Sequence, residues 1–138
     1  MIKSTVCYLV HDEKWLMLLR NKKQHDLNHG KWIGVGGKLK TNETPYECMV
    51  REVIEETGYQ VQSALYCGII HFHYEHHEDE EIYVYQTSDY VGTLHECSEG
   101  TLAYIPKKDI LDLELWEGDR IFLEKMFRNE VPFSIRLY

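Results

Sequence analysis

The chain has 138 residues, 43% of them hydrophobic, and a formal net charge of −8 at pH 7. This length fits one domain, residues 1–138, with a buried core, and the acidic balance argues against duplex nucleic acid as a partner because phosphate contacts require clustered lysines and arginines. Because the sequence has no apolar run long enough to cross a bilayer and no basic-then-apolar start, we expect a cytoplasmic protein that does not bind membranes.

Two strands are expected first, at residues 3–11 and 15–20, on either side of a polar turn. A polar loop follows at residues 21–31, and a short strand at residues 32–35 leads into a pair of glycines. A helix is expected between residues 44 and 58, and this helix carries most of the chemistry that the sequence suggests.

The second half of the chain is expected to form a hairpin, a further strand and a last helix. Residues 61–74 and 82–92 are rich in Val, Ile and Tyr and predict a long hairpin around an acidic turn. A strand is expected at residues 102–105, followed by a helical turn near residues 107–112. The apolar spacing of residues 117–128 predicts the last helix. Strands combined with one central and one terminal helix indicate an α+β domain built in layers.

The central helix has clear start and stop signals. Thr44 is expected to cap its N-terminus, Pro45 suits the first position, and Glu47 stands three residues after the cap, where it completes a capping box. Gly58 supplies the left-handed residue that ends the helix. The apolar stripe of the helix is formed by Met49, Val50, Val53 and Ile54.

Three carboxylates occupy another face of this helix, at Glu52, Glu55 and Glu56. Like charges at spacings i, i+3 and i+4 destabilise a helix, and Glu55 and Glu56 stand in the last turn, where the helix dipole disfavours anions. A solvated face more often includes lysine or arginine. A bound cation would explain the cluster, and hard oxygen ligands suit Mg²⁺ or Mn²⁺.

Residues 37–59 match the pattern G-x5-E-x7-R-E-U-x-E-E-x-G-U, in which U is an apolar residue, at every fixed position. Seven specified residues at about one in twenty each give about one chance match in 10⁹ starts. The segment resembles the signature of the Nudix hydrolases, which use a divalent metal to cleave nucleoside diphosphates linked to another group. The fixed residues are Gly37, Glu43, Arg51, Glu52, Glu55, Glu56 and Gly58.

The resemblance covers essentially the whole chain and implies the fold of Nudix proteins. That fold is an α/β/α sandwich with a mixed sheet, in which the signature forms a loop, a helix and a second loop, and a helix lies near the C-terminus. The resemblance places Glu52, Glu55 and Glu56 at the metal-ligand positions, with the backbone carbonyl of Gly37 as an additional ligand.

By the same resemblance, Glu43 and Arg51 occupy the positions of a structural ion pair that holds the loop to the helix, which fits the cost of leaving a buried arginine unpaired. The reaction requires a water that is activated by metal and by a carboxylate. Glu52 is the expected general base, and a glutamate outside the helix is the alternative. An outer metal ligand of this kind is expected at Glu99, with Glu96 as the next choice.

Two basic residues are candidates for binding the substrate phosphates. Arg20 at the end of the second strand and Lys38 directly after the glycine pair match basic positions in relatives that handle nucleoside triphosphates. Lys22 and Lys23 are weaker candidates, since exposed lysines are common on any protein surface. We therefore expect Arg20 and Lys38 to contact the phosphates.

Residues 32–38 and 115–120 resemble the MutT-type branch of the family, which hydrolyses oxidised purine nucleoside triphosphates. By that resemblance Trp116 stacks on the base and Asp119 binds its edge, while the alternative for Trp116 is a core aromatic residue at the start of a helix. Some relatives have a base-binding asparagine directly after the first tryptophan. This chain has Ile33 there, which has no hydrogen-bonding group, so strict preference for 8-oxo-dGTP is not expected.

The sequence thus indicates a Mg²⁺-dependent enzyme that converts a nucleoside triphosphate to the monophosphate and pyrophosphate. The expected substrates are 8-oxo-dGTP or related (d)NTPs, which gives a role in cleansing the nucleotide pool. Another enzymatic interpretation is hydrolysis of ADP-ribose, a nucleotide sugar or a dinucleoside polyphosphate. A non-catalytic nucleotide sensor is the alternative from another class, but degenerate modules of that kind usually lose signature carboxylates, and this chain retains all of them.

Overall fold

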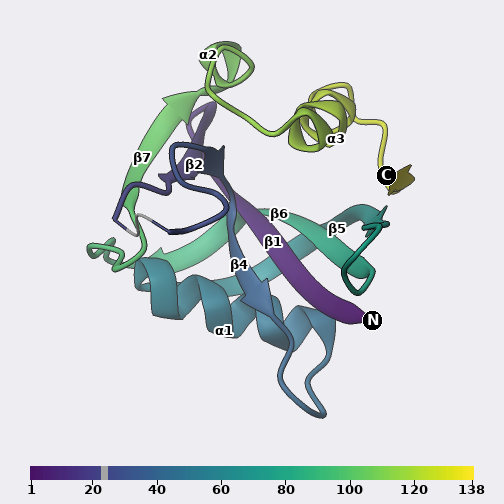
Figure 1. The fold of residues 1–138 in the computed structure, drawn as a ribbon. Coiled ribbons are helices and arrows are strands. Elements are labelled where there is room, and N and C mark those ends of the chain that lie inside the picture. Colours follow the sequence, from purple (N-terminus) through teal and green to yellow (C-terminus); the bar gives the residue numbers. More distant parts are fainter. Residues whose placement is uncertain (23–24) are drawn as a thin grey trace.

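The computed structural model of the protein describes residues 1–22 and 25–138. Within these ranges four strands precede the first helix, three strands follow it, and two helices precede the last strand (Figure 1). In chain order the elements are β1 (Ile2–His11), β2 (Lys14–Leu19), β3 (Trp32–Ile33), β4 (Val35–Lys38), α1 (Pro45–Thr57), β5 (Tyr59–Phe72), β6 (Glu80–Gly92), β7 (Thr101–Pro106), α2 (Lys107–Ile110), α3 (Glu117–Phe127) and β8 (Phe133–Leu137).

The strands form a mixed sheet in which β1 is central. The hydrogen-bonded order is β3-β2-β1-β6-β5-β8, with β4 pairing with β1 and β7 with β2. Strand β1 is antiparallel to β2 and β4 but parallel to β6, and β5 is antiparallel to β6 but parallel to β8. Gly36 and Gly37 of β4 pair with Val6 and Thr5 of β1, so the start of the signature is held against the middle of the sheet.

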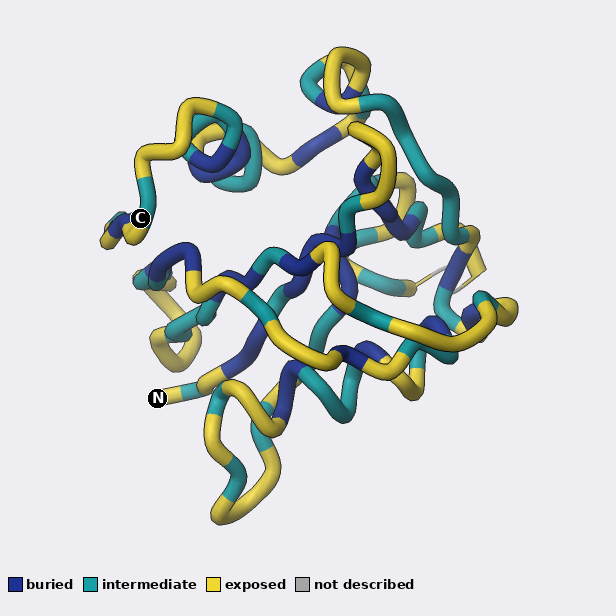
Figure 2. The backbone as a smooth tube through the Cα atoms, turned by 180° about the vertical axis from the view of Figure 1, so that it is seen from behind, coloured by how far each residue is buried: buried dark blue, intermediate teal, exposed yellow. Residues whose placement is uncertain are grey.

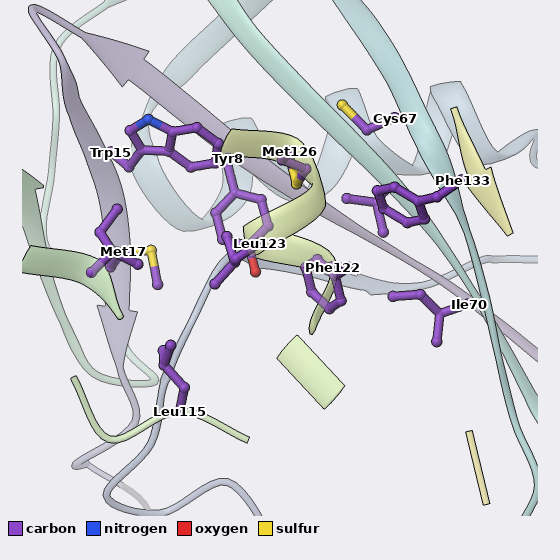
Figure 3. Close-up of a cluster of buried hydrophobic side chains, with 12 residues drawn as sticks. Tyr8, Trp15, Met17, Cys67, Ile70, Leu115, Phe122, Leu123, Met126 and Phe133 are labelled. Carbon is purple, nitrogen blue, oxygen red and sulfur yellow. The ribbon is translucent and has the colours of Figure 1, made fainter. Parts of the chain in front are cut away.

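Side chains alternate between the two faces of the sheet, and both faces are apolar because each is covered by a helix. On β1, Cys7 and Leu9 pack in the cluster on the α1 side, while Tyr8 between them packs in the cluster on the α3 side. Figure 1 shows α1 on one side of the sheet and α3 on the other. Figure 3 shows Phe122 and Leu123 of α3 beside Tyr8.

The expected α+β sandwich with a mixed sheet is confirmed. The two predicted N-terminal strands are β1 and β2, the predicted hairpin is β5 and β6, and the predicted last helix is α3. Strand β8 was not predicted, although Phe133, Ile135 and Leu137 alternate with polar residues as in a half-buried strand.

The strand expected at residues 32–35 is divided at Gly34 into β3 and β4. Gly34 crosses β1 so closely that an added Cβ would lie 2.6 Å from Val6 Cγ2 and 2.9 Å from Tyr8 Cε1. The absence of a side chain there allows the chain to leave β2 and join β1 within a few residues.

Buried residues follow the strands and the inner sides of the helices, and exposed residues gather in the loops (Figure 2). The loop between β4 and α1 is exposed at residues 40–42, which leaves the start of the signature helix open to solvent. In the described part of the chain, no helix has both the length and the apolar character needed to cross a membrane.

Candidate active site

Helix α1 begins and ends where the sequence predicts. The Glu47 N–H donates to Thr44 Oγ1 at 3.1 Å, and the Thr44 N–H donates to Glu47 Oε1 at 3.0 Å, so the capping box is confirmed. Gly58 follows the helix with a φ of 87°, and its N–H donates to the carbonyl of Ile54. These ends fix which residues of α1 face the loop that precedes it.

Glu43 and Arg51 form the expected ion pair between this loop and α1. Arg51 Nε donates to Glu43 Oε2 at 2.7 Å, and Arg51 Nη2 donates to Glu43 Oε1 at 2.9 Å. The Lys40 N–H donates to the same carboxylate at 2.9 Å. The hydrogen bonds from Arg51 and then that from Lys40 lower the pKa of Glu43 to about 2. Arg51 Nη2 also donates to the carbonyl of Lys38 at 3.2 Å, so both ends of the loop are tied to the helix.

Arg51 also contacts two of the helix carboxylates. Its Nη1 donates to Glu52 Oε1 at 2.8 Å and lies 3.4 Å from Glu55 Oε2. The Glu55 side chain is 53% exposed, whereas that of Glu52 is 16% exposed and lies against Gly37. An added Cβ at Gly37 would lie 2.5 Å from the Glu52 carboxyl carbon, so a side chain at this position would displace that carboxylate. Burial raises the pKa of Glu52, and Arg51 opposes this effect.

Glu56 of α1 and Glu99, which precedes β7, are brought together. Burial, and then the charges of Glu99 and Glu52, raise the pKa of Glu56 to about 8. The Gly36 N–H donates to Glu56 Oε2 at 3.3 Å. Glu96 is exposed, so the structure places Glu99 rather than Glu96 beside the signature. Adjacent carboxylates that have lost solvent are costly unless a cation or a proton accompanies them.

The donors in this region fit a hard divalent cation, because they are carboxylate oxygens and the carbonyl oxygen of Gly37. Glu52, Glu56 and Glu99 are the side chains best placed to hold it, since each is shielded and each lies near another carboxylate. No three acidic, histidine or cysteine side chains among the described residues already converge as a metal cage. In this conformation Arg51 binds Glu52 Oε1.

Arg20 lies between the acidic residues and the loop that follows β2. Its Nη1 is 3.5 Å from Glu99 Oε2, and its Nε is 2.7 Å from Asp26 Oδ2. The Arg20 side chain is only 14% exposed. The structure therefore places this phosphate-binding candidate at the edge of the proposed metal site.

The lysine candidates differ in what they contact. Lys38 is exposed at the end of β4, and its backbone carbonyl accepts a hydrogen bond from Arg51. Lys22 Nζ donates to the carbonyl of Cys97 at 2.8 Å, which makes it a structural contact in this conformation. Lys23 lies outside the described residues.

Trp116 and Asp119 lie at the start of α3. Trp116 immediately precedes the helix and is 37% exposed, which is unlike a core aromatic residue, and its Nε1 donates to Asn28 Oδ1 at 2.7 Å. Asp119 stands in the first turn, where burial raises its pKa to about 7. Ile33 packs against the apolar cluster on the α1 side of the sheet.

The sequence did not identify three polar residues that the structure brings to this region. Asp26 pairs with Arg20, and Asn28 binds Trp116 across 88 residues of chain. The buried hydroxyl of Tyr8 has no well-directed hydrogen-bond partner among the described residues, and burial and then the charge of Asp119 raise its pKa well above the usual value. The partners of Asn28 and Tyr8 are distant in the sequence, and the six-residue spacing of Arg20 and Asp26 within a loop follows no regular pattern.

The fold is that of known solved proteins. The chain is similar to the mutator MutT protein from Bacillus halodurans, with a TM-score of 0.88 and 22% sequence identity. The match covers 100% of this chain and 90% of that one. This likeness shows that the two chains share a fold.

Sequence comparisons agree with this likeness. The chain is 28% identical over 133 residues to YvcI, an uncharacterized Nudix hydrolase of Bacillus subtilis (strain 168), which covers 93% of this chain and 80% of that protein. It is 26% identical over 114 residues to an oxidized purine nucleoside triphosphate hydrolase of Danio rerio, which covers 82% of this chain and 73% of that protein. The profile of the NUDIX domain matches residues 1–126, a range that includes the signature, Glu99 and Trp116. The chain therefore belongs to the Nudix family of hydrolases.

Proposed function

We propose that this Nudix hydrolase is a Mg²⁺-dependent pyrophosphohydrolase that converts a nucleoside triphosphate and water to the monophosphate and pyrophosphate. The proposed substrates are oxidised purine (d)NTPs such as 8-oxo-dGTP. The observation that carries the proposal is the placement of Glu56 against Glu99 beside Glu52, because this arrangement of shielded carboxylates requires a cation when all three are ionised. The name of the Danio rerio relative supports the substrate class.

Glu52 is the proposed general base. A bound Mg²⁺ would offset the phosphate charge and make a water molecule more acidic. Because Arg51 Nη1 donates to Glu52 Oε1, the second carboxylate oxygen is the atom proposed to accept a proton from the attacking water. Burial raises the pKa of Glu52, which makes its carboxylate a better proton acceptor than an exposed one.

Arg20 and Lys38 are the proposed phosphate-binding residues. Asp26 and Glu99 contact Nε and Nη1 of Arg20, and a guanidinium has five N–H donors, so further donors are left for phosphate oxygens. The backbone carbonyl of Lys38 accepts a hydrogen bond from Arg51, and its exposed side chain is free of the core, which supports a role in phosphate binding.

Trp116 and Asp119 are the proposed base-binding residues. The exposed indole offers a stacking surface, and base stacking tolerates any base because each has a π face. Guanine and its 8-oxo form present adjacent N1–H and N2–H donors, which an ionised aspartate can accept together. Adenine has an acceptor at N1, so the same carboxylate would disfavour it.

A second candidate is hydrolysis of another diphosphate, such as ADP-ribose, a nucleotide sugar or a dinucleoside polyphosphate. The observation that favours it is Ile33, which packs into the apolar cluster on the α1 side and has no group that could bind an oxidised base by a polar contact. In this case Trp116 would still stack on a base, while the reaction products would differ.

One assay distinguishes these activities. The purified protein with Mg²⁺ is incubated with (d)NTPs, 8-oxo-dGTP, ADP-ribose, a nucleotide sugar and a dinucleoside polyphosphate, and the products are separated. The expected result is a nucleoside monophosphate and pyrophosphate, with the highest kcat/KM for purine triphosphates. A higher kcat/KM for ADP-ribose or a dinucleotide would replace the proposed substrate, and binding without turnover would favour a sensor.

A further inference from the structure

The indole of Trp116 is held by a loop that the proposed chemistry does not use. We call residues 25–31 the tryptophan loop. Besides the hydrogen bond from Trp116 Nε1 to Asn28 Oδ1, Lys31 Nζ lies 5.0 Å from the centre of the indole. Lys31 is itself 3.6 Å from Glu114 Oε2, close to Trp116 in sequence. These contacts occupy one edge and one face of the indole, and 37% of Trp116 remains exposed to a ligand.

The tryptophan loop is shaped around Asp26. The Asp26 carboxylate accepts the Asn28 N–H at 3.2 Å, and its carbonyl accepts the His29 N–H at 3.0 Å. The Lys31 N–H donates to the Asn28 carbonyl at 2.9 Å. A turn closed by these bonds fixes the backbone of Asn28, from which the side-chain amide reaches Trp116 Nε1.

The loop is also anchored to the acidic residues. The Asp26 and Arg20 side chains, 10% and 14% exposed, form an ion pair at 2.7 Å, although the Nε hydrogen does not point well at the oxygen. The Gly30 N–H donates to the Arg20 carbonyl at 2.8 Å. Because Arg20 also lies 3.5 Å from Glu99, a series of contacts runs from the proposed metal site through Arg20, Asp26 and Asn28 to the indole.

We propose that Asn28 is a positioning residue that holds the Trp116 indole in the orientation in which a base stacks on it. The inference rests on the proposed function, because it takes the ligand to be a nucleotide. An exposed tryptophan that is free to rotate would have to be ordered when the base binds, and that ordering weakens binding. Asn28 orders the indole in advance, at a fixed place relative to the carboxylates.

The test compares Asn28→Leu, which has a similar size but no acceptor, with Asn28→Asp, which keeps an acceptor for the indole N–H. Asn28→Leu should raise KM for the nucleotide by about 2- to 10-fold, the effect of ordering one large side chain, with kcat within twofold of the parent. Asn28→Asp should recover most of that loss. Asn28→Ala is the second variant if Asn28→Leu does not fold.

Two controls separate this role from a general loss of structure. Tripolyphosphate has no base, so its inhibition constant should be the same in Asn28→Leu as in the parent. Any change of this inhibition constant in Asn28→Asp measures the effect of the added negative charge. Asn21→Leu removes a different amide, whose Nδ2 donates to Thr101 Oγ1 at 3.0 Å, and should leave the KM for the nucleotide within twofold of the parent. Tryptophan fluorescence should change in Asn28→Leu and be quenched less by nucleotide.

The outcomes also separate the inference from the proposed function. If Trp116→Ala weakens nucleotide binding but Asn28→Leu and Asn28→Ala do not, Asn28 has no positioning role and the proposed function stands. Equal loss of tripolyphosphate and nucleotide affinity in Asn28→Leu would also overturn the inference, since the effect would then lie at the phosphates. A parent protein that neither binds nor hydrolyses any nucleotide would overturn both.

Discussion

The two ends of the candidate site are built in different ways. The carboxylate end comes almost entirely from β4, α1 and the loop between them, and Glu99 is added from the segment before β7. The base end is assembled from the tryptophan loop, the start of α3 and β1, which are far apart in the sequence. At the carboxylate end, contacts between residues close in the sequence hold several charged side chains together. At the base end, segments distant in the sequence pack around individual polar side chains and exclude solvent from them.

This difference explains how the two ends depend on their surroundings. At the carboxylate end, Arg51 binds Glu43 and Glu52 directly. Removal of one of these charges therefore changes the pKa values of the neighbouring groups through Coulomb interactions. At the base end, Asp119 is perturbed by burial and has no charged partner among the causes of its pKa shift. Burial also raises the pKa of Glu52 and Glu56, so the first end should respond to both charge and burial, whereas the second should respond to burial and shape alone.

The largest expected effect breaks the carboxylate end. Glu56→Gln should lower kcat by about 10²-fold or more, because the charge stabilisation that depends on the metal is lost. The stability of the metal-free protein should stay the same or rise, since one of three neighbouring negative charges is removed. Steady-state kinetics at saturating Mg²⁺ and melting curves without metal test both statements. A kcat within threefold of the parent would count against the role of Glu56.

The next effect concerns the base end. Asp119→Ala should lower kcat/KM for guanine triphosphates by roughly 10- to 10³-fold, because the donors of the base lose their acceptor. The ratio of kcat/KM for dGTP to that for dATP should therefore decrease. Mg²⁺ affinity should be unchanged, since no carboxylate of the signature is among the causes of the Asp119 pKa shift. Kinetics with dGTP, 8-oxo-dGTP and dATP measure the first effect, and Mg²⁺ titration measures the second. An unchanged base preference would place base recognition elsewhere and favour the non-triphosphate substrates.

A third variant separates structure from chemistry within the signature. Glu43→Gln should lower activity by about 10- to 100-fold, as for other residues that orient metal ligands, because Arg51 loses its charged partner. Unlike Glu56→Gln, it should also lower the melting temperature, since the loop and α1 are joined through this pair. Melting curves of the two variants in the same buffer make the comparison. The opposite order of stabilities would contradict this division of roles.

The ease of prediction from sequence follows the same division. The capping box of α1 and the Glu43–Arg51 pair involve residues within eight positions of one another. The capping box was predicted from residue types alone, and the ion pair from the resemblance of this local segment to the family signature. The contact of Asn28 with Trp116 spans 88 residues, and no local spacing indicates it. Glu99 was found through the family resemblance, and its preference over Glu96 depends on the conformation of an irregular segment.

The fold shows the same limit at its edges. The helix and the main hairpin were predicted from periodicity and turn residues, which act over a few positions. Strand β8 forms because residues 133–137 pair with residues 68–72 of β5, a contact between distant segments. The division of the expected strand at Gly34 depends on how closely that residue crosses Val6 and Tyr8, which the sequence does not show.

The smallest expected effect is the pH dependence of stability that Asp119 causes at the base end. Burial raises the pKa of Asp119 to about 7 from an ordinary value of 3.8, so the folded protein binds this proton more tightly than the unfolded chain does. The contribution of Asp119 to the free energy of unfolding is therefore full below about pH 4 and is lost as the pH rises through 7. The asparagine in Asp119→Asn does not titrate. This position should therefore make no pH-dependent contribution to the free energy of unfolding in the variant.

Melting temperatures of the parent and Asp119→Asn at pH 5 and pH 8, without metal, test this statement. The variant should gain several degrees relative to the parent at the higher pH. Glu56, whose pKa is raised to about 8, titrates in both proteins, so its contribution cancels in the difference. Glu56→Gln serves as the matched control. Its difference in melting temperature from the parent should continue to change at higher pH, because the pKa of Glu56 is higher than that of Asp119. A difference in melting temperature between Asp119→Asn and the parent that is the same at pH 5 and pH 8 would instead mean that solvent reaches the Asp119 carboxylate. The base end would then lack the buried acceptor that guanine recognition requires.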